Sequence, residues 1–268
     1  MRVPAAQNFS TNRSAAAGLV AAVLGICLLS TAGFSQDESP ARSLISVLAV
    51  QDAIGPATSD YIRSGISEAD ESGAELVVLQ LDTPGGLDSS MRDIIQAILA
   101  SRVPVVTYVF PQGARAASAG TYILYASHIA AMAPATTTGA ATPVSIIGGG
   151  SNPFAPESEE PEDSDDAEEA AEEEQASEPA VPEPANASER KAINDAVSYI
   201  RGLAERRGRN ADWAERAVRF ADSVSAQQAL ELGAVDFIAT DLDDLMNQID
   251  GLEVEVAGRR ETLSTSSV

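Results

Sequence analysis

Only two side chains in this chain could accept a proton from an alcohol near neutral pH, because the sequence holds one histidine, His128, and one lysine, Lys191. The other sixteen basic residues are arginines, which stay protonated in proteins and cannot act as a base. A serine nucleophile would therefore depend on one of these two residues or on a carboxylate.

The candidate nucleophile is Ser118, which lies in the run of small residues 113–120. The apolar run 103–109 predicts a strand before it, and a helix is predicted to begin near Ser118. Such a junction lets a substrate backbone approach the hydroxyl and leaves N–H groups of the first helical turn unpaired, as acyl transfer requires. The alternative role for Ser118 is a helix N-cap.

The two candidate bases differ in where they stand relative to Ser118. His128 follows it by ten residues, which is about 15 Å along a helix, so it is excluded as the base and is interpreted as a structural residue at a helix end. Lys191 is far away in sequence and free to approach in space.

A second glycine-rich turn follows the buried strand predicted at 76–81. It holds two adjacent glycines, Gly85 and Gly86, ahead of an amphipathic run at 91–99. At the carboxyl end of a parallel strand, such a pair can turn backbone N–H groups toward a developing oxyanion. The alternative is a tight turn in which a glycine provides positive φ.

Several motifs in the same order resemble the NfeD family of membrane-bound serine proteases, which is related to signal peptide peptidase and to ClpP and is encoded beside stomatin-like proteins. The resemblance covers most of residues 44–240 apart from one insertion. The motifs are Leu-Asp-Thr-Pro-Gly-Gly at 81–86, Gly-Ala-Arg-Ala-Ala-Ser-Ala-Gly at 113–120, Ala-Ala-Met-Ala-Pro at 130–134, Lys-Ala-Ile-Asn-Asp at 191–195, Tyr-Ile-Arg at 199–201 and Arg-Asn at 209–210.

The resemblance implies an α/β fold of the Clp/crotonase type, built from repeated β-β-α units. It implies that Ser118 is the nucleophile and Lys191 the general base, with an oxyanion site formed around Gly85, Gly86 and Ala119. It further implies a peptide substrate with an apolar segment, a stomatin-like partner and a homodimer, and no cofactor or metal.

A lysine can act as a base only in its neutral form, and a free lysine is almost fully protonated at neutral pH. Burial must lower the pKa of a catalytic lysine, helped by any cationic neighbour. The apolar residues that follow Lys191 predict a helix face against which its stem could pack, and Arg190 precedes it. The alternative is a solvated lysine at the edge of a polar linker.

The first 35 residues have the layout of a signal peptide, with arginines, an apolar stretch at 15–34 and a switch to polar residues, and cleavage is expected near Ser35. An uncleaved membrane anchor is the alternative. Either predicts an exported, periplasmic or extracytoplasmic protein. The one cysteine, Cys27, lies in this stretch, so the mature part would hold no disulfide and no cysteine nucleophile or metal site.

The acidic character of the chain is concentrated in one segment. Between Glu157 and Glu183 there are fourteen acidic residues and no basic ones, so the rest carries −9 of the formal net charge of −23. Residues 147–188 are therefore predicted to be a disordered acidic insertion, and a solvated linker is favoured over a dedicated docking tail. The segment joins the two halves of the domain, where a flexible lid or substrate-entry loop could sit. No basic patch appears, which argues against nucleic acid as a partner.

The rest of the chain predicts one α/β domain, with a nucleophile half at 40–146, a base half at 189–250 and a C-terminal tail at 251–268. Asn210 and Ser225 are predicted helix caps, and Trp213 is predicted to be a core or interface anchor. Strands are expected at 44–50, 76–81, 103–109, 129–132 and 233–238, and helices at 57–72, 189–207, 211–220 and 226–232.

The function predicted on these grounds is a serine endopeptidase with a Ser118–Lys191 dyad. One alternative is a crotonase-type acyl-CoA enzyme, which uses paired backbone N–H groups and needs neither side chain. The other is a catalytically silent scaffold for a membrane partner, in which Lys191 stays exposed.

Overall fold

The computed structural model of the chain describes residues 44–144 and 187–266. The predicted leader and nearly all of the predicted acidic insertion lie outside the described residues. Along the described chain the elements are β1 (Ile45–Val50), α2 (Pro56–Glu71), β2 (Leu76–Leu81), α3 (Asp88–Ala100), β3 (Val105–Val109), β4 (Arg115–Ala117), α4 (Ala119–Ala126), β5 (Ile129–Met132), β6 (Thr137–Gly139), α5 (Ala187–Arg207), α6 (Ala211–Arg219), β7 (Ser223–Ser225), α7 (Ala226–Glu231), β8 (Phe237–Ile238), α8 (Leu242–Ile249), β9 (Glu253–Val256) and β10 (Arg259–Thr262).

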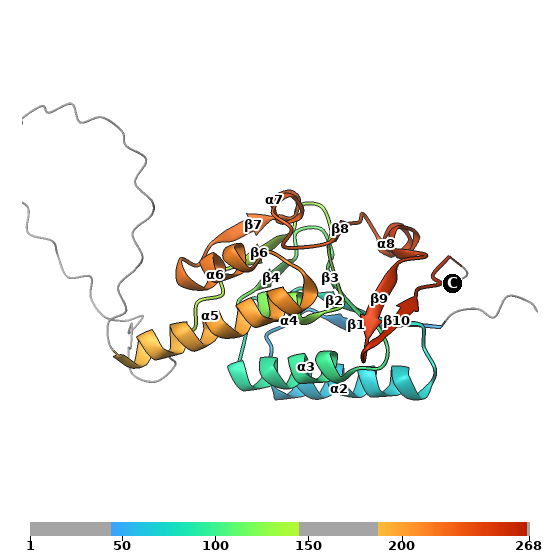
Figure 1. Cartoon of the computed structure of the whole chain (residues 1–268), viewed down its shortest axis with the longest axis horizontal. Helices are drawn as coiled ribbons and strands as arrows, with labels where there is room; N and C mark the ends of the chain where they lie inside the picture. The colour runs from blue at the N-terminus through green and yellow to red at the C-terminus, as the bar shows by residue number, and fades with distance from the viewer. Residues whose placement is uncertain (1–43, 145–186, 267–268) are drawn as a thin grey trace, which may run out of the picture. The chain divides into compact units, whose positions relative to one another are not determined.

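The centre of the fold is a five-stranded parallel sheet in the order β1-β2-β3-β5-β8 (Figure 1). Strands β2 and β3 lie in its middle and are buried along almost their whole length, as expected of parallel strands covered on both faces. The carboxyl ends of β2 and β3 lead into the glycine pair and toward Ser118, so the two candidate segments meet at one edge of the sheet.

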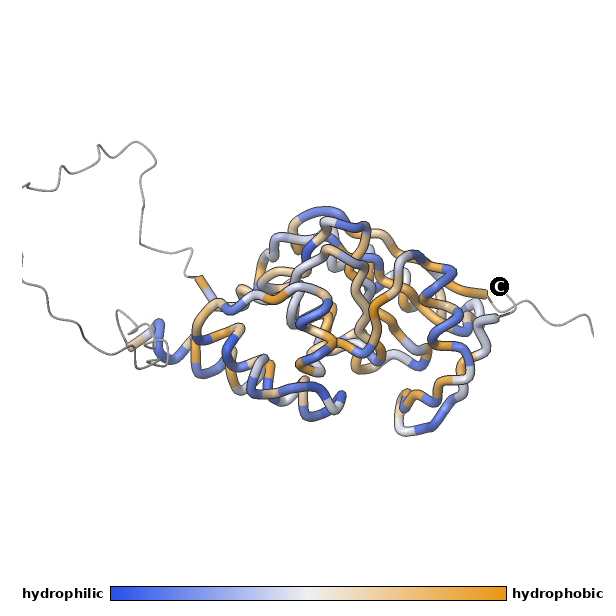
Figure 2. The backbone as a smooth tube through the Cα atoms, turned by 90° about the horizontal axis from the view of Figure 1, so that it is seen from above, coloured by the Kyte–Doolittle hydropathy of each residue, from blue (hydrophilic) through white to orange (hydrophobic). Residues whose placement is uncertain are grey.

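Alternate residues of the strands pack into two separate cores. One face of the sheet, with Val77 and Leu79 of β2, packs against helices α2 to α6. The other face, with Leu76 and Val78, is covered by α8 and the β9–β10 hairpin. In the tube view of Figure 2, polar and apolar residues alternate along the helices, as expected of helices that bury one side.

The last segment corrects one sequence-based boundary. Residues 251–268 were expected to be a tail, but β9 and β10 form an antiparallel hairpin whose Val254 and Val256, with the following Leu263, are buried against the sheet. Four-residue strands around a tight turn give too short an alternation to be recognised from sequence. The folded domain therefore extends past residue 250.

A second, three-stranded sheet in the order β4-β6-β7 stands beside the carboxyl ends of the main strands. Its strands have three residues each, and the sequence analysis did not predict them. Together with the main sheet they confirm the expected β-β-α repetition, as β3–β4–α4 and again as β5–β6–α5. Strand β4 ends directly before Ser118.

Candidate active site

Ser118 lies at the sharp turn between β4 and α4, where it is the N-cap residue of the helix. Its φ of 52° and ψ of −115° are unusual for a residue with a side chain. Its N–H donates to the carbonyl of Gly139 at 2.9 Å. Its hydroxyl makes no capping bond, so the structure gives Ser118 the position of a helix cap without the hydrogen bond that defines that role.

The glycine pair lies directly against Ser118. Gly85 has a φ of 120°, and a Cβ on it would stand 2.7 Å from the Cβ of Ser118 and 3.2 Å from its Oγ. A Cβ on Gly86 would stand 2.0 Å from the carbonyl oxygen of Ile54. The buried Thr83 fixes this turn because its Oγ1 accepts from the N–H of Gly85 at 3.2 Å. Gly85 is therefore required both by its positive φ and by close approach, and Gly86 by close approach.

Two backbone N–H groups beside Ser118 are left without a partner. Within residues 44–144 and 187–266, no acceptor is found for the N–H of Gly86 or for that of Ala119. Ala119 is the first residue of α4, and N–H groups of a first helical turn have no acceptor inside the helix. Both residues line the same cavity as Ser118. These are the kinds of donor that can stabilise an oxyanion.

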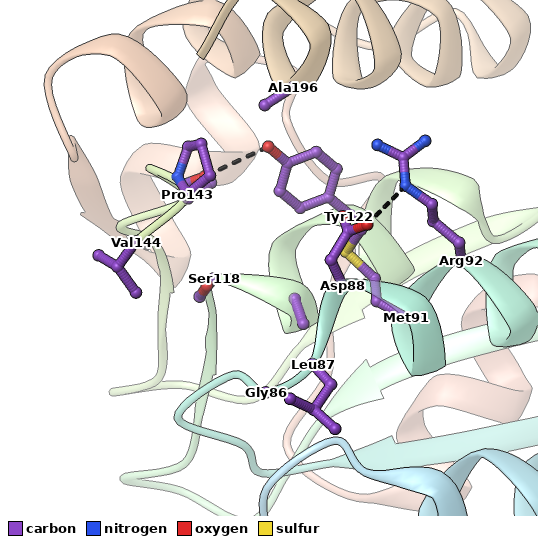
Figure 3. Close-up of a pocket in the computed structure, with 12 residues that line it drawn as sticks. Gly86, Leu87, Asp88, Met91, Arg92, Ser118, Tyr122, Pro143, Val144 and Ala196 are labelled. Carbon is purple, nitrogen blue, oxygen red and sulfur yellow. Dashed lines mark hydrogen bonds and ion pairs between the residues drawn. The ribbon is translucent and has the colours of Figure 1, made fainter. Parts of the chain in front are cut away.

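The cavity beside Ser118 has a volume of about 180 Å³ and a mostly apolar wall (Figure 3). Such a wall suits an apolar side chain. Its lining residues are Gly86, Leu87, Asp88, Met91, Arg92, Ser118, Ala119, Tyr122, Ala141, Pro143, Val144 and Ala196. Leu87 and Val144 are also largely exposed.

Arg92 joins three helices around this cavity. Its Nη2 lies 2.7 Å from a carboxylate oxygen of Asp195 on α5 and its Nε 2.8 Å from one of Asp88. Its guanidinium stands 4.4 Å from the ring centroid of Tyr199, which stacks on Tyr122 of α4 with the ring centroids 6.1 Å apart. Helices α3, α4 and α5 thus meet in one network of charged and aromatic contacts.

Tyr122 is held as a neutral donor in the cavity wall. Its hydroxyl donates to the carbonyl of Ala141 at 3.2 Å, and burial raises the pKa of Tyr122 above its usual range, with a smaller contribution from Asp88. It is therefore unsuited to be the base for Ser118.

Lys191 lies near the start of α5 and is exposed. It lines a separate surface hollow together with Arg190, Asn194 and Asp195, whereas α5 contributes Ala196 to the cavity of Ser118. The expectation that the stem of Lys191 would pack in apolar surroundings is not met, because the buried positions of α5 begin only at Ala196. Ala196 is about 7.5 Å further along the helix axis.

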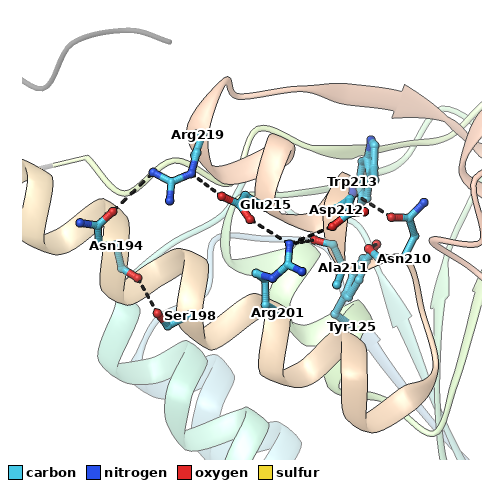
Figure 4. A network of polar contacts seen from close by, with 10 residues as sticks. All are labelled: Tyr125, Asn194, Ser198, Arg201, Asn210, Ala211, Asp212, Trp213, Glu215 and Arg219. Atoms are coloured by element: carbon cyan, nitrogen blue, oxygen red, sulfur yellow. Dashed lines mark hydrogen bonds and ion pairs between the residues drawn. The ribbon is translucent and has the colours of Figure 1, made fainter.

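Helix α5 is fixed to α6 by a polar network (Figure 4). Arg201 of α5 pairs with Asp212 at 3.0 Å and with Glu215 at 2.8 Å. Glu215 also pairs with Arg219, whose Nη1 reaches the side chain of Asn194 at 3.4 Å. The hydrogen bonds from Arg219 and Arg201 lower the pKa of Glu215, so its carboxylate is ionised at neutral pH. The network orders α5 from Asn194 onward.

His128 has the structural role expected of it. Its Nδ1 accepts from the N–H of Val105 at 3.1 Å. Burial, with smaller contributions from Arg207, Arg206 and Arg209, lowers the pKa of His128 to about 3. The imidazole is therefore neutral near pH 7. It lies past the end of α4 that is opposite Ser118, and its Nδ1 is already hydrogen-bonded to Val105.

Other sequence-based assignments are confirmed, and some site residues were missed. Trp213 is buried and stacks on Tyr125, while Asn210 and Ser225 cap α6 and α7.

Arg92 and Tyr122, which line the cavity, were not predicted. No local signal identifies them, because their contacts join elements that are far apart in sequence.

None of the helices formed by the described residues is long and apolar enough to cross a membrane. The described residues also hold no group of three or more side chains placed to bind a metal ion.

Comparison with known sequences places the chain beside one family. The N-terminal domain model of NfeD1b matches residues 44–176. The membrane-bound protease PH1510 of Pyrococcus horikoshii is 33% identical over 230 residues, which is 85% of this chain and 45% of that protein. The membrane protein NfeD1b of Bacillus subtilis is 35% identical over 136 residues, which is 50% of this chain and 30% of that protein. The chain thus spans less than half the length of these relatives.

Two solved structures of the 1510-N membrane-bound stomatin-specific protease resemble this one, each with a TM-score of 0.68 and 32% identity. A lysine-to-alanine mutant in complex with a substrate peptide is matched over 85% of this chain and 90% of that chain. A serine-to-alanine mutant is matched over 85% of this chain and 96% of that chain. The similarity extends over the whole α/β fold and confirms the fold class expected from sequence.

Proposed function

This chain belongs to the NfeD family, and on that premise we propose that it is a serine endopeptidase in which Ser118 is the nucleophile and Lys191 the general base. The observation that carries the proposal is Ser118 itself, held at positive φ on a strand-to-helix turn with no capping bond to its hydroxyl, beside an apolar cavity. Serine nucleophiles are presented on sharp turns of this kind. The solved relatives include a serine mutant and a lysine mutant of a protease.

In the proposed reaction, the Oγ of Ser118 attacks the carbonyl carbon of a peptide bond and passes its proton to the neutral amine of Lys191. The tetrahedral intermediate collapses to an ester of Ser118 as the C–N bond breaks, and Lys191 returns the proton to the departing amine. A water molecule, deprotonated by Lys191, then hydrolyses the ester and restores the serine hydroxyl.

The oxyanion of both tetrahedral intermediates would accept hydrogen bonds from backbone N–H groups around Gly85–Gly86 and at Ala119. Two observations support this assignment. The N–H groups of Gly86 and Ala119 have no acceptor within the described ranges, and Gly85 lies against Ser118. Loss of one such donor costs on the order of 100- to 1,000-fold in turnover.

The proposal requires a rearrangement that brings the amine of Lys191 to Ser118. In this structure the residues of α5 before Ala196 are exposed or only partly buried, and Ile193 is among those that pack against the core. Their contacts to the rest of the protein include the Arg92–Asp195 and Arg219–Asn194 side-chain contacts. We propose that the first turns of α5 shift toward Ser118 when substrate fills the cavity.

The proposed substrate is an apolar segment of a membrane-associated protein, and the proposed partner is a stomatin-like protein. The apolar wall of the cavity supports the first, and the stomatin specificity of the 1510-N protease supports the second. Export or anchoring through residues 1–35, a periplasmic location and a homodimer are further parts of the proposal. Mass spectrometry of the mature N-terminus and sedimentation of the purified protein test them.

A fluorophosphonate probe tests the proposed function, because it forms a covalent adduct with an activated serine. We expect labelling of the wild type at pH 8, none of Ser118→Ala, and little of Lys191→Ala. His128→Asn is the control and should be labelled at the wild-type rate. Labelling that persists without Ser118 would contradict the proposal.

The same experiment separates the two alternatives. A wild type that is not labelled at pH 8 favours the silent scaffold, with which the exposed Lys191 of this structure also agrees. Turnover of an acyl-CoA thioester that survives Ser118→Ala would favour the crotonase-type enzyme. The similarity to proteases supports the peptidase over both.

A further inference from the structure

Helix α4 carries Ser118 at its start and ends inside the protein. It has eight residues, and every one of them is buried. The last four carbonyl groups of a helix have no donor partner inside it, and here they cannot be hydrated from a solvent-exposed side. Their partners must come from the protein.

Two arginines bind these carbonyls. The side chain of Arg209 is 1% exposed, and its Nη1 donates to the carbonyls of Tyr125 at 3.1 Å and Ser127 at 3.0 Å. Arg207 donates from Nε to the carbonyl of Ala126 at 2.8 Å. Longer contacts from Arg209 reach the carbonyls of Leu124 at 3.5 Å and His128 at 3.4 Å.

Asp236 completes this arginine clamp. Its Oδ2 lies 2.5 Å from the Nη2 of Arg209 and accepts from the N–H of Ala130 on β5 at 2.8 Å. The buried guanidinium is therefore paired and hydrogen-bonded, which is the condition under which a buried charge is tolerated. The fork of an arginine can bind several carbonyls at once, and a lysine cannot reproduce that geometry.

The clamp is one of two contacts that set the register of α4 on α5. At the other, Tyr199 stacks on Tyr122. At the clamp, Arg207, the last residue of α5, donates to the carbonyl of the last residue of α4. Near the start of α4, Ala196 lines the same cavity as Ser118 and Ala119. The two helices thus run side by side in the same direction, and one carries Ser118 while the other carries Lys191.

We propose that Arg209, assisted by Arg207, is a positioning residue for the nucleophile. The clamp holds the carboxyl end of α4 on the junction between α5 and α6 and so fixes the place of Ser118 relative to the helix that bears Lys191. Neither arginine touches the cavity, so their action on the reaction is exerted through α4. The inference rests on the proposed function, since it concerns the reaction of Ser118.

The test compares Arg209→Lys and Arg207→Gln with Arg206→Gln. Arg206 is the matched control because it is exposed and precedes Arg207 on the same helix. The first measurement is hydrogen exchange of the α4 amides, made in a Ser118→Ala background so that it does not depend on activity. We expect faster exchange in residues 119–126 of both clamp variants, unchanged exchange in β2 and β3, and no change in Arg206→Gln.

The second measurement is the rate at which a fluorophosphonate labels Ser118 as a function of probe concentration. We expect the maximal rate to fall on the order of 10- to 100-fold in both clamp variants, because a displacement of about 1 Å has an effect of that size. The half-saturating probe concentration should stay the same. A purely structural defect would lower the fraction of protein that is labelled and leave the rate of that fraction unchanged.

Wild-type labelling rates in the folded clamp variants, or unchanged exchange in α4, would overturn the inference. If Arg209→Lys does not fold, Arg207→Gln decides the matter. A wild type that is not labelled would instead refute the proposed function, and hydrogen exchange would still show whether the arginines hold α4.

Discussion

Ser118 joins β4 to α4 with a φ of 52° and a ψ of −115°, a conformation that costs a non-glycine residue on the order of 1–3 kcal/mol. The surrounding hydrogen bonds hold it there, because its N–H donates to Gly139 and its carbonyl accepts from Thr121. The hydroxyl forms no capping bond in return. Backbone strain at a serine whose hydroxyl makes no capping bond is typical of a reactive residue.

The first residue-scale prediction concerns Gly85. Gly85→Ala should lower the rate of Ser118 labelling by at least about 100-fold, because the new Cβ would stand 2.7 Å from that of Ser118. Gly113→Ala is the matched control, since Gly113 also has positive φ and a methyl group added there would meet nothing within 4 Å. Equal labelling rates for the two variants would show that the glycine turn does not bear on Ser118.

The second residue-scale prediction concerns His128 and acid stability. The folded-state pKa of His128 is about 3, against an ordinary value of 6.5, so the unfolded chain takes up the proton first as pH falls. The stability that depends on neutral His128 is complete above about pH 6.5 and is lost progressively toward pH 3. The slope is at most about 1.4 kcal/mol per pH unit.

Urea unfolding of the wild type and of His128→Asn between pH 7 and 4 measures this effect. Asparagine keeps an acceptor for the N–H of Val105 and does not titrate. The difference in unfolding free energy between the two proteins should therefore shrink as pH falls. Parallel curves over that range would show that His128 is not the titrating group.

At the residue scale, the sequence indicated which residues lie near the candidate site better than it indicated which of them are buried and what they contact. Ser118, the glycine pair and the structural role of His128 followed from residue types, their spacing and the family motifs. The exposure of Lys191 did not, because the fully buried positions of α5 begin only at Ala196, and before it Ile193 packs against the core only in part. The carbonyl groups that Arg209 binds were likewise not predicted, since they lie more than 80 positions away in the chain.

Helices α3, α4 and α5 wall the cavity, and the contact between α3 and α5 is an ion pair at its edge. Arg92 is 33% exposed and Asp195 is 67% exposed, so solvent screens their attraction. The aromatic contacts of Arg92 with Tyr199, and of Tyr199 with Tyr122, add to the connection. This edge is the part of α5 that must move in the proposed reaction.

The element-scale prediction is that the Arg92–Asp195 ion pair restrains the start of α5 and adds little to the free energy of unfolding. A double-mutant cycle of Arg92→Gln and Asp195→Asn should give a coupling energy of about 0.2–1 kcal/mol in unfolding experiments. Arg63→Gln with Asp60→Asn, an exposed pair on α2, is the matched control. A coupling above about 2 kcal/mol would mean that the start of α5 is fixed too firmly to move.

Longer elements with a clear hydrophobic pattern were predicted within a few residues, as for β2, α5 and α6. The three-residue strands β4, β6 and β7 were not, because three residues are too few to show alternation. They form only where the ends of the main strands and the α6–α7 connection come together, which is a property of the tertiary fold. The strand that presents Ser118 is one of them.

The two hydrophobic cores lie on opposite faces of the main sheet, and only one of them leads to the candidate active site. Helices α2 to α6 pack on the face that leads to Ser118, and α8 with the β9–β10 hairpin covers the other face. The second core lies against β2 and β3, whose carboxyl ends carry the site segments. The β9–β10 hairpin therefore supports the strands that carry the site from the opposite face of the sheet.

The whole-molecule prediction concerns this support. Val256→Ala in β9 should lower the free energy of unfolding by about 2 kcal/mol, since Val256 is fully buried between the hairpin and the sheet. Glu255→Ala, on the exposed side of the same strand, should change it by less than about 0.5 kcal/mol. Denaturant unfolding measures both. Equal stabilities of the two variants would contradict the packing of the β9–β10 hairpin against the sheet.

The proposed mechanism depends most on an amine from α5 that takes the proton of Ser118, and chemical restoration of that amine tests it most directly. In a Cys27→Ser background, Lys191→Cys introduces a single thiol, which 2-bromoethylamine converts to a thioether analogue of lysine. Peptide hydrolysis should be lost in Lys191→Cys and return after alkylation, with a pH profile moved to lower pH because sulfur makes the new amine less basic. Hydrolysis that survives in Lys191→Cys, or that does not return with the amine, would contradict the account.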